Sequence, residues 1–398
     1  MQKKNWPLLV LTSLAYIAFG LVTAVIGVII SRFQETYRVP LWIAGLLPFA
    51  FYLAYGLCSI PFGLAMDRLG GRLVIMIGML MMTAGCFLFY FSSDWFLTVL
   101  MVFVIGVGVT AIQTAGNPVI RELDHPRKYA SNLTIIIGIS AFGYALSPVM
   151  VPYMEAKGYG WQLVYLIFGI LNAVLFLMLL IVRFPRGSIA ENEQVNLKVI
   201  FQLLKNPIIV TYSMGIFLYV AGEVGVSSYI VTFMEKQHGV GLQESLFPEG
   251  TFLQSSFPSV SAFIVALFWA LQAMGRIVIG PLMNRIRPKN VFVICSGLCC
   301  LSLVASIFGG KSLALVSFAL VGLFTCASFT AIFSAAIQSF TKFHGTISGI
   351  LCTAIVGGAV GGILVGAVGH VLDLRFGMAV NLLMFLYVFW LAIFGKGK

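Results

Sequence analysis

Charged residues are scarce in this sequence. Asp, Glu, Lys and Arg make up only 9% of its 398 residues, where an ordinary soluble domain has about 25%. Acidic residues are the scarcer kind, with 13 against 24 lysines and arginines. This shortage of charge excludes a soluble globular protein. Apolar residues take the place of the charges, since 60% of the chain is hydrophobic and its mean hydropathy is +1.02, which indicates an integral membrane protein.

Several sequence patterns of enzymes are also missing. The chain has no HExxH and no GxSxG, and its predicted loops hold no cluster of metal ligands. All seven cysteines fall within apolar runs, where we expect small packing residues. A dinucleotide-like run, Gly106 to Ala111, lies in an apolar stretch without a strand–helix–strand context, so we interpret it as helix packing. We therefore predict no enzyme activity, no catalytic residue, no metal and no cofactor.

Long apolar runs recur along the whole chain. Each has about 20 residues and can cross a hydrocarbon core of about 30 Å as a helix, which satisfies its own backbone hydrogen bonds. The predicted fold class is an all-α membrane protein with twelve transmembrane helices. Their predicted ranges are 7–31, 40–66, 73–92, 95–118, 130–153, 161–183, 208–234, 260–283, 291–308, 313–336, 346–370 and 377–395.

Lysine and arginine are distributed unevenly over the predicted loops. With the amino terminus inside, 17 of them fall in cytoplasmic segments and six in outer loops, which matches the positive charge that cytoplasmic loops carry. Both termini are therefore predicted to be cytoplasmic, in a bacterial-type cytoplasmic (inner) membrane. Because this topology and the lipid bilayer account for the net charge of +11, no nucleic-acid partner is expected. We expect a monomer.

A charged ten-residue segment, Gly63 to Arg72 (GLAMDRLGGR), separates the second and third apolar runs. A degraded copy, Gly280 to Lys289 (GPLMNRIRPK), has its matching residues 217 positions later. Two copies at matched places indicate an internal duplication. We expect these segments to be cytoplasmic hinges that latch an inner gate between the two halves of the protein, with Asp67 paired to basic or helix-terminal donors across the interface of the two bundles. The predicted gating residues are Gly63, Asp67, Arg68, Gly70, Arg72 and Arg285.

The duplication predicts two pseudo-symmetric six-helix bundles, residues 1–183 and 208–398. A cytoplasmic linker over 184–207 joins them, and its residues 195–204 have the periodicity of a helix that could lie along the membrane surface. The outer loop 235–259 is rich in Gly, Pro and Ser, which argues against one continuous helix there.

Two charged residues, Glu223 and Arg276, lie deep inside predicted spans. A charge at mid-membrane costs a few kcal/mol, so it normally faces a partner or a wet cavity. Other polar residues share their helix faces in the seventh and eighth spans, and a further pair lies in the fourth. We predict that the candidate substrate-binding residues are Gln113, Asn117, Tyr219, Glu223, Ser227, Trp269, Gln272 and Arg276.

Structural roles are open for several of these residues. Arg276 could be an ion pair or carbonyl clamp that holds the second bundle together, and Glu223 its static partner. Asn117 precedes Pro118 and could cap a helix, while Gln113 could form a hydrogen bond between helices.

The twelve spans and the two copies of the charged segment resemble the major facilitator superfamily over essentially the whole chain. Residues 111–123 (AIQTAGNPVIREL), residues 219–234 (YVAGEVGVSSYIVTFM) and the pair Gly275-Arg276 resemble, more narrowly, the fucose–galactose–glucose/proton symporter family. The resemblance implies sugar binding and proton coupling through a fourth-helix Glu and a first-helix Asp. Here those two positions hold Gln113 and Gly27.

The leading prediction is a secondary active transporter that works by alternating access. We expect proton-coupled uptake of a sugar-like polar solute, with Glu223 as the proton-coupling carboxylate because the two family carboxylates are absent. Two alternatives are an organic-anion carrier that binds a carboxylate through Arg276, and an exporter of an amphipathic compound. The expected partners are a small-molecule solute, a proton or other coupling ion, and the lipid bilayer. A membrane sensor is not expected, since no large polar output domain lies between the spans.

Overall fold

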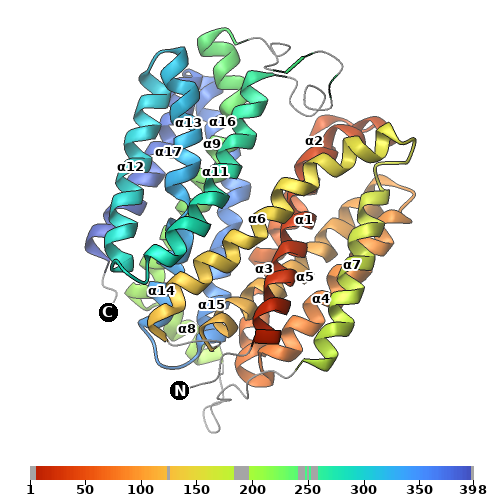
Figure 1. The fold of residues 1–398 in the computed structure, drawn as a ribbon, viewed down its shortest axis with the longest axis vertical. Coiled ribbons are helices and arrows are strands. Elements are labelled where there is room, and N and C mark those ends of the chain that lie inside the picture. Colours follow the sequence, from red (N-terminus) through yellow and green to blue (C-terminus); the bar gives the residue numbers. More distant parts are fainter. Residues whose placement is uncertain are drawn as a thin grey trace. The chain divides into compact units, whose positions relative to one another are not determined.

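The computed structural model describes residues 6–122, 126–182, 197–240, 247–248, 251 and 259–395, and all regular elements within these ranges are helices (Figure 1). Eleven helical stretches among them are long and apolar enough to cross a bilayer. The remaining predicted span, 130–153, is covered by α6 (Tyr129–Ala156), which has 28 residues. A helix therefore lies over each of the twelve predicted spans.

The first six predicted spans correspond to α1 (Trp6–Tyr37), α3 (Leu46–Leu69), α4 (Gly71–Tyr90), α5 (Trp95–Glu122), α6 and α7 (Leu163–Ile181). The next three correspond to α9 (Pro207–His238), α11 (Val260–Leu282) and α12 (Pro288–Phe308), and the twelfth to α17 (Leu374–Phe394). A short α2 (Leu41–Ala44) precedes α3, and a 3-10 turn (Pro126–Lys128) precedes α6.

Two predicted spans are interrupted helices. The span predicted over 313–336 consists of α13 (Lys311–Thr325) and α14 (Ser328–Gln338), separated by a turn at Cys326 and Ala327. The span predicted over 346–370 consists of α15 (His344–Thr353) and α16 (Gly357–Val371), joined by a 3-10 turn, Ala354–Val356. Breaks of this kind free backbone carbonyls at membrane depth, where only other protein groups or enclosed water can satisfy them.

The chain divides into two compact units. Unit 1 comprises Met1–Ser213, Phe333–Ile355 and Gly397–Lys398, and unit 2 comprises Met214–Ile332 and Val356–Lys396. The predicted six-helix bundles, 1–183 and 208–398, are a different division of the chain, and they stay a prediction.

Unit 1 is built on close helix pairs. In it α1 packs on α6, α4 packs on α5 and α7, and α3 packs on both α5 and α15. Glycine permits the last contact, since a Cβ at Gly349 of α15 would lie 2.5 Å from the carbonyl oxygen of Ser59 in α3. A segment from late in the sequence thus becomes part of a unit built mainly from the first half.

Unit 2 contains most of α9 together with α11, α12, α13, α16 and α17. Its helices α12 and α13 pack on each other, α13 also packs on α11, and α17 packs on α12 and α16. The buried core includes Tyr219, Phe233, Phe268 and Phe318.

Two sequence predictions fall partly on undescribed residues. The helix predicted within 195–204 is present as α8 (Leu197–Leu204), whereas residues 184–196 of the predicted linker lie outside the described residues. In the predicted outer loop 235–259, α9 extends to His238, and residues 241–246, 249–250 and 252–258 lie outside the described residues.

Candidate functional site

The carboxylate of Glu223 lies in the interior of unit 2, on α9, and only 9% of the residue is exposed. The sequence places it one helical turn after Tyr219, so the two side chains share a face. The Tyr219 hydroxyl donates a hydrogen bond to Glu223 Oε1 at 2.5 Å. From α11, the amide nitrogen of Gln272 also donates to Glu223 Oε1. Two neutral donors from two helices therefore converge on one oxygen of a buried carboxylate.

Arg276 lies one turn beyond Gln272 on α11 and completes this group. Its Nη2 is 3.9 Å from Glu223 Oε1, and the two side chains are 10% and 11% exposed. In a buried ion pair of this kind each charge offsets the desolvation cost of the other, so removing either partner leaves a buried charge that destabilises the fold. The group of Tyr219, Glu223, Gln272 and Arg276 is called the Glu223 cluster below.

The break between α13 and α14 supplies acceptors to the Glu223 cluster. The carbonyl oxygen of Cys326 accepts from Arg276 Nε at 3.4 Å, and that of Thr325 accepts from the Tyr219 hydroxyl at 3.3 Å. The Thr325 hydroxyl accepts from Gln272 Nε2 at 3.2 Å. The interrupted helix thus takes part in the polar cluster, which explains how its turn is accommodated at membrane depth.

The Glu223 cluster combines a titratable group with donors and acceptors that a polar solute could use. The charges of Glu223 and Arg276 interact strongly in this interior, because burial limits screening by water. Gln272, Tyr219 and Thr325 are the kinds of side chain that bind hydroxyl groups. The arrangement therefore offers both donors and acceptors of the kind that a neutral hydroxylated compound needs.

Ser227 and Trp269 were predicted on the same faces. The Ser227 hydroxyl donates to the backbone oxygen of Val224 at 3.3 Å, within its own helix. Trp269 is half-buried and makes an edge-to-face contact with Phe268 at a centroid distance of 5.2 Å. These described contacts do not join either residue to the Glu223 cluster, and the predicted solute contacts of both stay untested.

In unit 1, the fourth-span residues Gln113 and Asn117 are held by tyrosines from other helices. The Tyr55 hydroxyl of α3 donates to Gln113 Oε1, and the Tyr16 hydroxyl of α1 donates to Asn117 Oδ1, both at 2.6 Å. The Tyr129 hydroxyl of α6 donates to the backbone oxygen of Asn117 at 3.1 Å. All these groups are buried. Gln113 is therefore an interhelical hydrogen-bonding residue, one of the two roles left open by the sequence.

One donor of this group is unused. Asn117 is fully buried, and its Nδ2 has no hydrogen-bond partner among the described residues. An orphaned buried amide costs free energy unless water or a ligand satisfies it. Asn117 lies within α5, which continues to Glu122, so a helix-capping role before Pro118 does not fit its position.

The predicted gating segment places Asp67 at the amino terminus of α15, within unit 1. Asp67 Oδ1 accepts from the backbone nitrogen of Gly345 at 2.8 Å. Asp67 Oδ2 accepts from the backbone nitrogen of Thr346 at 2.7 Å and from its hydroxyl at 2.6 Å. A carboxylate is well suited to this place, because free N–H groups and the helix dipole make a helix amino terminus positive. The expected helix-terminal partner of Asp67 is thus observed.

The other gating residues lie around this contact or apart from it. Gly63 faces Gly345, and Gly70 ends α3 with a φ of 88°, a conformation that favours glycine. Arg68 lies in the last turn of α3, and Arg72 Nη2 donates to the backbone oxygen of Leu180 at 2.9 Å. Arg285 belongs to unit 2, where it is exposed in the turn after α11.

Sequence reasoning missed the partner side chains. Tyr16, Tyr55, Tyr129 and Thr325 bond the predicted residues but were not proposed. The sequence indicates such partners only weakly, because a tyrosine in an apolar run is equally typical of a buried core residue or of a residue at the membrane interface. Among the described residues, no group of three or more His, Cys, Asp or Glu side chains could hold a metal ion.

Comparison with known proteins finds relatives along the whole chain. The glucose/galactose transporter of Brucella abortus is 25% identical over 99% of this chain and 96% of its own length. The glucose/mannose transporter GlcP of Bacillus subtilis is 24% identical over 70% of this chain and 67% of its own length. These sugar-transporter relatives confirm the resemblance that the sequence showed in residues 111–123 and 219–234.

The fold is also that of solved structures. The crystal structure of the Escherichia coli fucose:proton symporter superposes with a TM-score of 0.84, covering 100% of both chains at 18% identity. The predicted fold of twelve membrane helices is thereby confirmed. The family model described as the Major Facilitator Superfamily matches residues 12–261. With that match over more than half its length, the chain belongs to the Major Facilitator Superfamily, whose members are multi-pass membrane transporters.

Proposed function

We propose that this protein takes up a small, hydroxylated, sugar-like solute together with protons, and that Glu223 carries the coupling proton. The observation that supports this most is the Glu223 cluster. It holds a mostly buried carboxylate against two neutral donors and an arginine. The solute class is supported by the relatives, which include a glucose/galactose transporter, a glucose/mannose transporter and a fucose:proton symporter.

The departures from the fucose–galactose–glucose/proton symporter family support Glu223 as the coupling residue. The positions of the two family carboxylates hold Gly27 and Gln113, and Gln113 is engaged by Tyr55. Within the part of the chain that the structure describes, Glu223 is a membrane-helix carboxylate that has both the burial and the hydrogen-bond donors that proton coupling needs. In this mechanism, protonated Glu223 favours solute binding on one side of the membrane. Hydration of the cluster on the other side releases the proton.

We further propose that Asp67 latches one gate of the alternating-access cycle. With the latch formed, its carboxylate holds the amino terminus of α15 on α3. Opening on that side would break these bonds and expose the solute site. In this proposal the gate is on the cytoplasmic side of the cytoplasmic membrane, because the loop charges favour an orientation with both termini in the cytoplasm. The proposal keeps the predicted division into two bundles of six helices.

The test is transport by Glu223→Gln in proteoliposomes, with glucose, galactose and fucose as solutes. We expect exchange between preloaded compartments to stay within about threefold of the wild type, and uphill accumulation driven by a pH gradient to be lost. Glu235→Gln is the matched control, because Glu235 lies on the same helix but is exposed.

Two outcomes would contradict the proposal. If Glu223→Gln still accumulates sugar under a pH gradient alone, Glu223 does not carry the proton. If purified wild-type protein is stabilised by carboxylates and by no sugar, the solute is an organic anion and Arg276 is its binding residue.

A further inference from the structure

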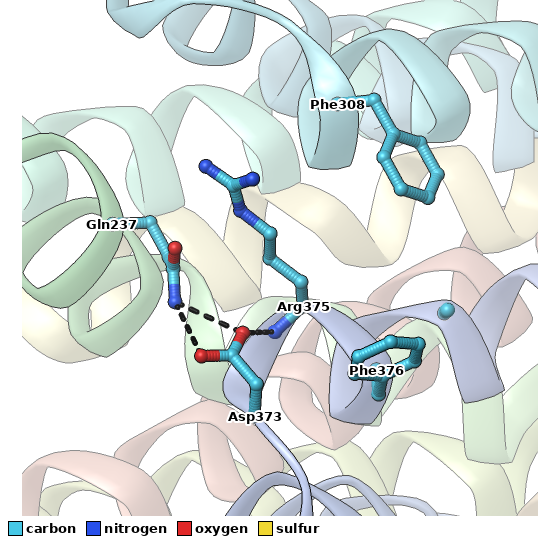
Figure 2. Close-up of a pocket in the computed structure, with 6 residues that line it drawn as sticks. Gln237, Phe308, Asp373, Arg375 and Phe376 are labelled. Atoms are coloured by element: carbon cyan, nitrogen blue, oxygen red, sulfur yellow. Dashed lines mark hydrogen bonds between the residues drawn. The ribbon is translucent and has the colours of Figure 1, made fainter.

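A surface hollow of about 490 Å³ lies at one end of unit 2, where three membrane helices end or begin (Figure 2). Its lining residues are Gln237, Phe308, Asp373, Arg375, Phe376 and Ala379. Gln237 belongs to the last turn of α9, Phe308 is the last residue of α12, and Asp373 caps the start of α17. Because candidate membrane spans end at these residues, we expect the hollow to lie at the level of the lipid headgroups.

The guanidinium of Arg375 is available to a ligand in this hollow. Neighbouring Asp373 is already engaged, since its oxygens accept from Gln237 Nε2 at 3.1 and 3.3 Å and from the Arg375 backbone nitrogen at 2.7 Å. The Arg375 side chain extends away from that carboxylate (Figure 2). Within the described ranges, no carboxylate forms an ion pair with it. Arg32 of unit 1 differs, because it pairs with Glu155 at 3.3 Å.

Two aromatic rings line the same hollow as this cation without being buried. Phe308 is 65% exposed and Phe376 is 60% exposed. Ala379 follows Phe376 by three residues on α17, so the apolar surface continues along one face of the helix. Exposed lysines, Lys236 beside Gln237 and Lys311 at the start of α13, add positive charge at this end of the unit.

We infer that this hollow binds an anionic phospholipid. Arg375 pairs with the phosphate, and one acyl chain lies against Phe308, Phe376 and the adjacent face of α17. The guanidinium of Arg375 presents paired donors that match a phosphate group. A phospholipid also carries an acyl chain, which can cover the exposed rings of Phe308 and Phe376 near the membrane surface. A soluble phosphate would use the cation but would leave both rings uncovered.

The test is native mass spectrometry of the full chain in detergent, titrated with phosphatidylglycerol or with phosphatidylcholine of the same acyl composition. We expect the wild type to prefer phosphatidylglycerol. Arg375→Gln should weaken the first phosphatidylglycerol site by about tenfold and leave phosphatidylcholine binding unchanged, as loss of one charge-assisted contact would. Phe376→Ala should weaken both lipids to a similar degree.

Lys157→Gln is the control, because Lys157 is an exposed cation of unit 1 outside this hollow. Thermal unfolding verifies that each variant is folded before lipid affinities are compared. The inference is overturned if Arg375→Gln binds phosphatidylglycerol as the wild type does, or if Lys157→Gln loses as much affinity. It is also overturned if glycerol 3-phosphate displaces the lipid at comparable concentrations, since the site would then take a free phosphate.

Discussion

Asp67 and Thr346 are joined by two hydrogen bonds to a single carboxylate oxygen. The Thr346 backbone nitrogen donates to Asp67 Oδ2 at 2.7 Å and its hydroxyl at 2.6 Å, across 279 residues of sequence. The other oxygen, Oδ1, accepts from Gly345 at 2.8 Å. Asp67 therefore acts as an N-cap supplied by another helix, and the stability of this cap depends on whether α3 and α15 stay together.

Replacing Asp67 with Asn should weaken the hold of α3 on α15. Asn keeps one acceptor oxygen but brings an amide that faces N–H donors, and it loses the interaction of a negative charge with the helix dipole. We expect the latched arrangement to lose about 1–2 kcal/mol, which is a five- to thirtyfold shift in population. Flux should slow while solute affinity stays within a few fold. Proteoliposome flux and equilibrium binding measure the two effects.

Asp94 provides the matched control for this prediction. Its Oδ1 accepts from the backbone nitrogen of Leu97 at 2.9 Å, so it caps its own helix, α5. Asp94→Asn should lower stability slightly without changing flux. An Asp67→Asn protein with normal turnover would remove the latch from the proposed mechanism.

The glycine contact between the same two helices gives a second prediction. A Cβ at Gly349 would lie 2.5 Å from the Ser59 carbonyl oxygen and 3.1 Å from Ile60 Cα, and neither backbone atom can move alone. Gly349→Ala should force α15 away from α3 and bias the protein in the same direction as Asp67→Asn. Gly362→Ala is its control, because a Cβ there meets nothing within 4 Å. Labels on α3 and α15, with the distance between them measured, check the separation. An unchanged distance would contradict this prediction.

The membrane helices were predictable because each is a long apolar run, and the hydrophobicity of a continuous segment can be determined from that segment alone. The breaks in two spans were not. Cys326 and Ala327 are ordinary helix residues, and neither they nor the residues of α14 include a proline or a glycine. The local sequence therefore gives no sign of a turn. The turn coincides with tertiary hydrogen bonds from Tyr219 and Arg276 to the freed carbonyls. Long-range contacts of this kind cannot be read from local sequence.

The candidate site was also predictable only in part: its charged and amide residues were found from the sequence, and most of their hydrogen-bond partners were not. Glu223, Gln272 and Arg276 were found because polar groups are costly inside a membrane, and the structure brings them together with Tyr219. The partners of Gln113 and Asn117 were missed, because tyrosine is common in apolar runs and its hydroxyl shows no helical periodicity. The contact of Asp67 with a helix terminus was predicted from its segment, whereas the identity of Thr346 as its partner required the fold. The gating role of Asp67 stays a prediction.

The Tyr55–Gln113 hydrogen bond gives a third prediction. Gln113 is 7% exposed, so loss of the Tyr55 hydroxyl leaves a buried acceptor unsatisfied. Tyr55→Phe should destabilise the protein by about 1–3 kcal/mol. Tyr165→Phe is the control, since the buried Tyr165 hydroxyl has no partner among the described residues and its loss should be neutral. Thermal unfolding measures both.

Sugar binding separates two roles of Gln113 in the same experiment. If Gln113 only links helices, Tyr55→Phe should lower the melting temperature and leave sugar affinity unchanged. If the pair also contacts solute, affinity should fall as well, because a freed Gln113 is no longer held in one orientation. Equal stability of Tyr55→Phe and the wild type would show that the hydrogen bond contributes nothing.

Arg276→Lys gives the last prediction and distinguishes the two solute classes. Arg276 reaches Glu223 with Nη2 and the Cys326 carbonyl with Nε, and a single ammonium cannot reproduce both contacts in that geometry. Since lysine keeps the charge that balances Glu223, we expect a loss of about 1–2 kcal/mol of stability rather than the larger cost of an unpaired buried carboxylate.

For a neutral sugar, solute affinity of Arg276→Lys should then stay within about threefold, because no carboxylate of the solute needs a paired donor. A loss of binding with an unchanged melting temperature would instead indicate an organic anion held by the guanidinium. Thermal unfolding and equilibrium binding on the same preparation separate these outcomes. If neither stability nor binding changes, Arg276 is neither the clamp of the Glu223 cluster nor a binding residue, and the balance of charge around Glu223 must come from another group.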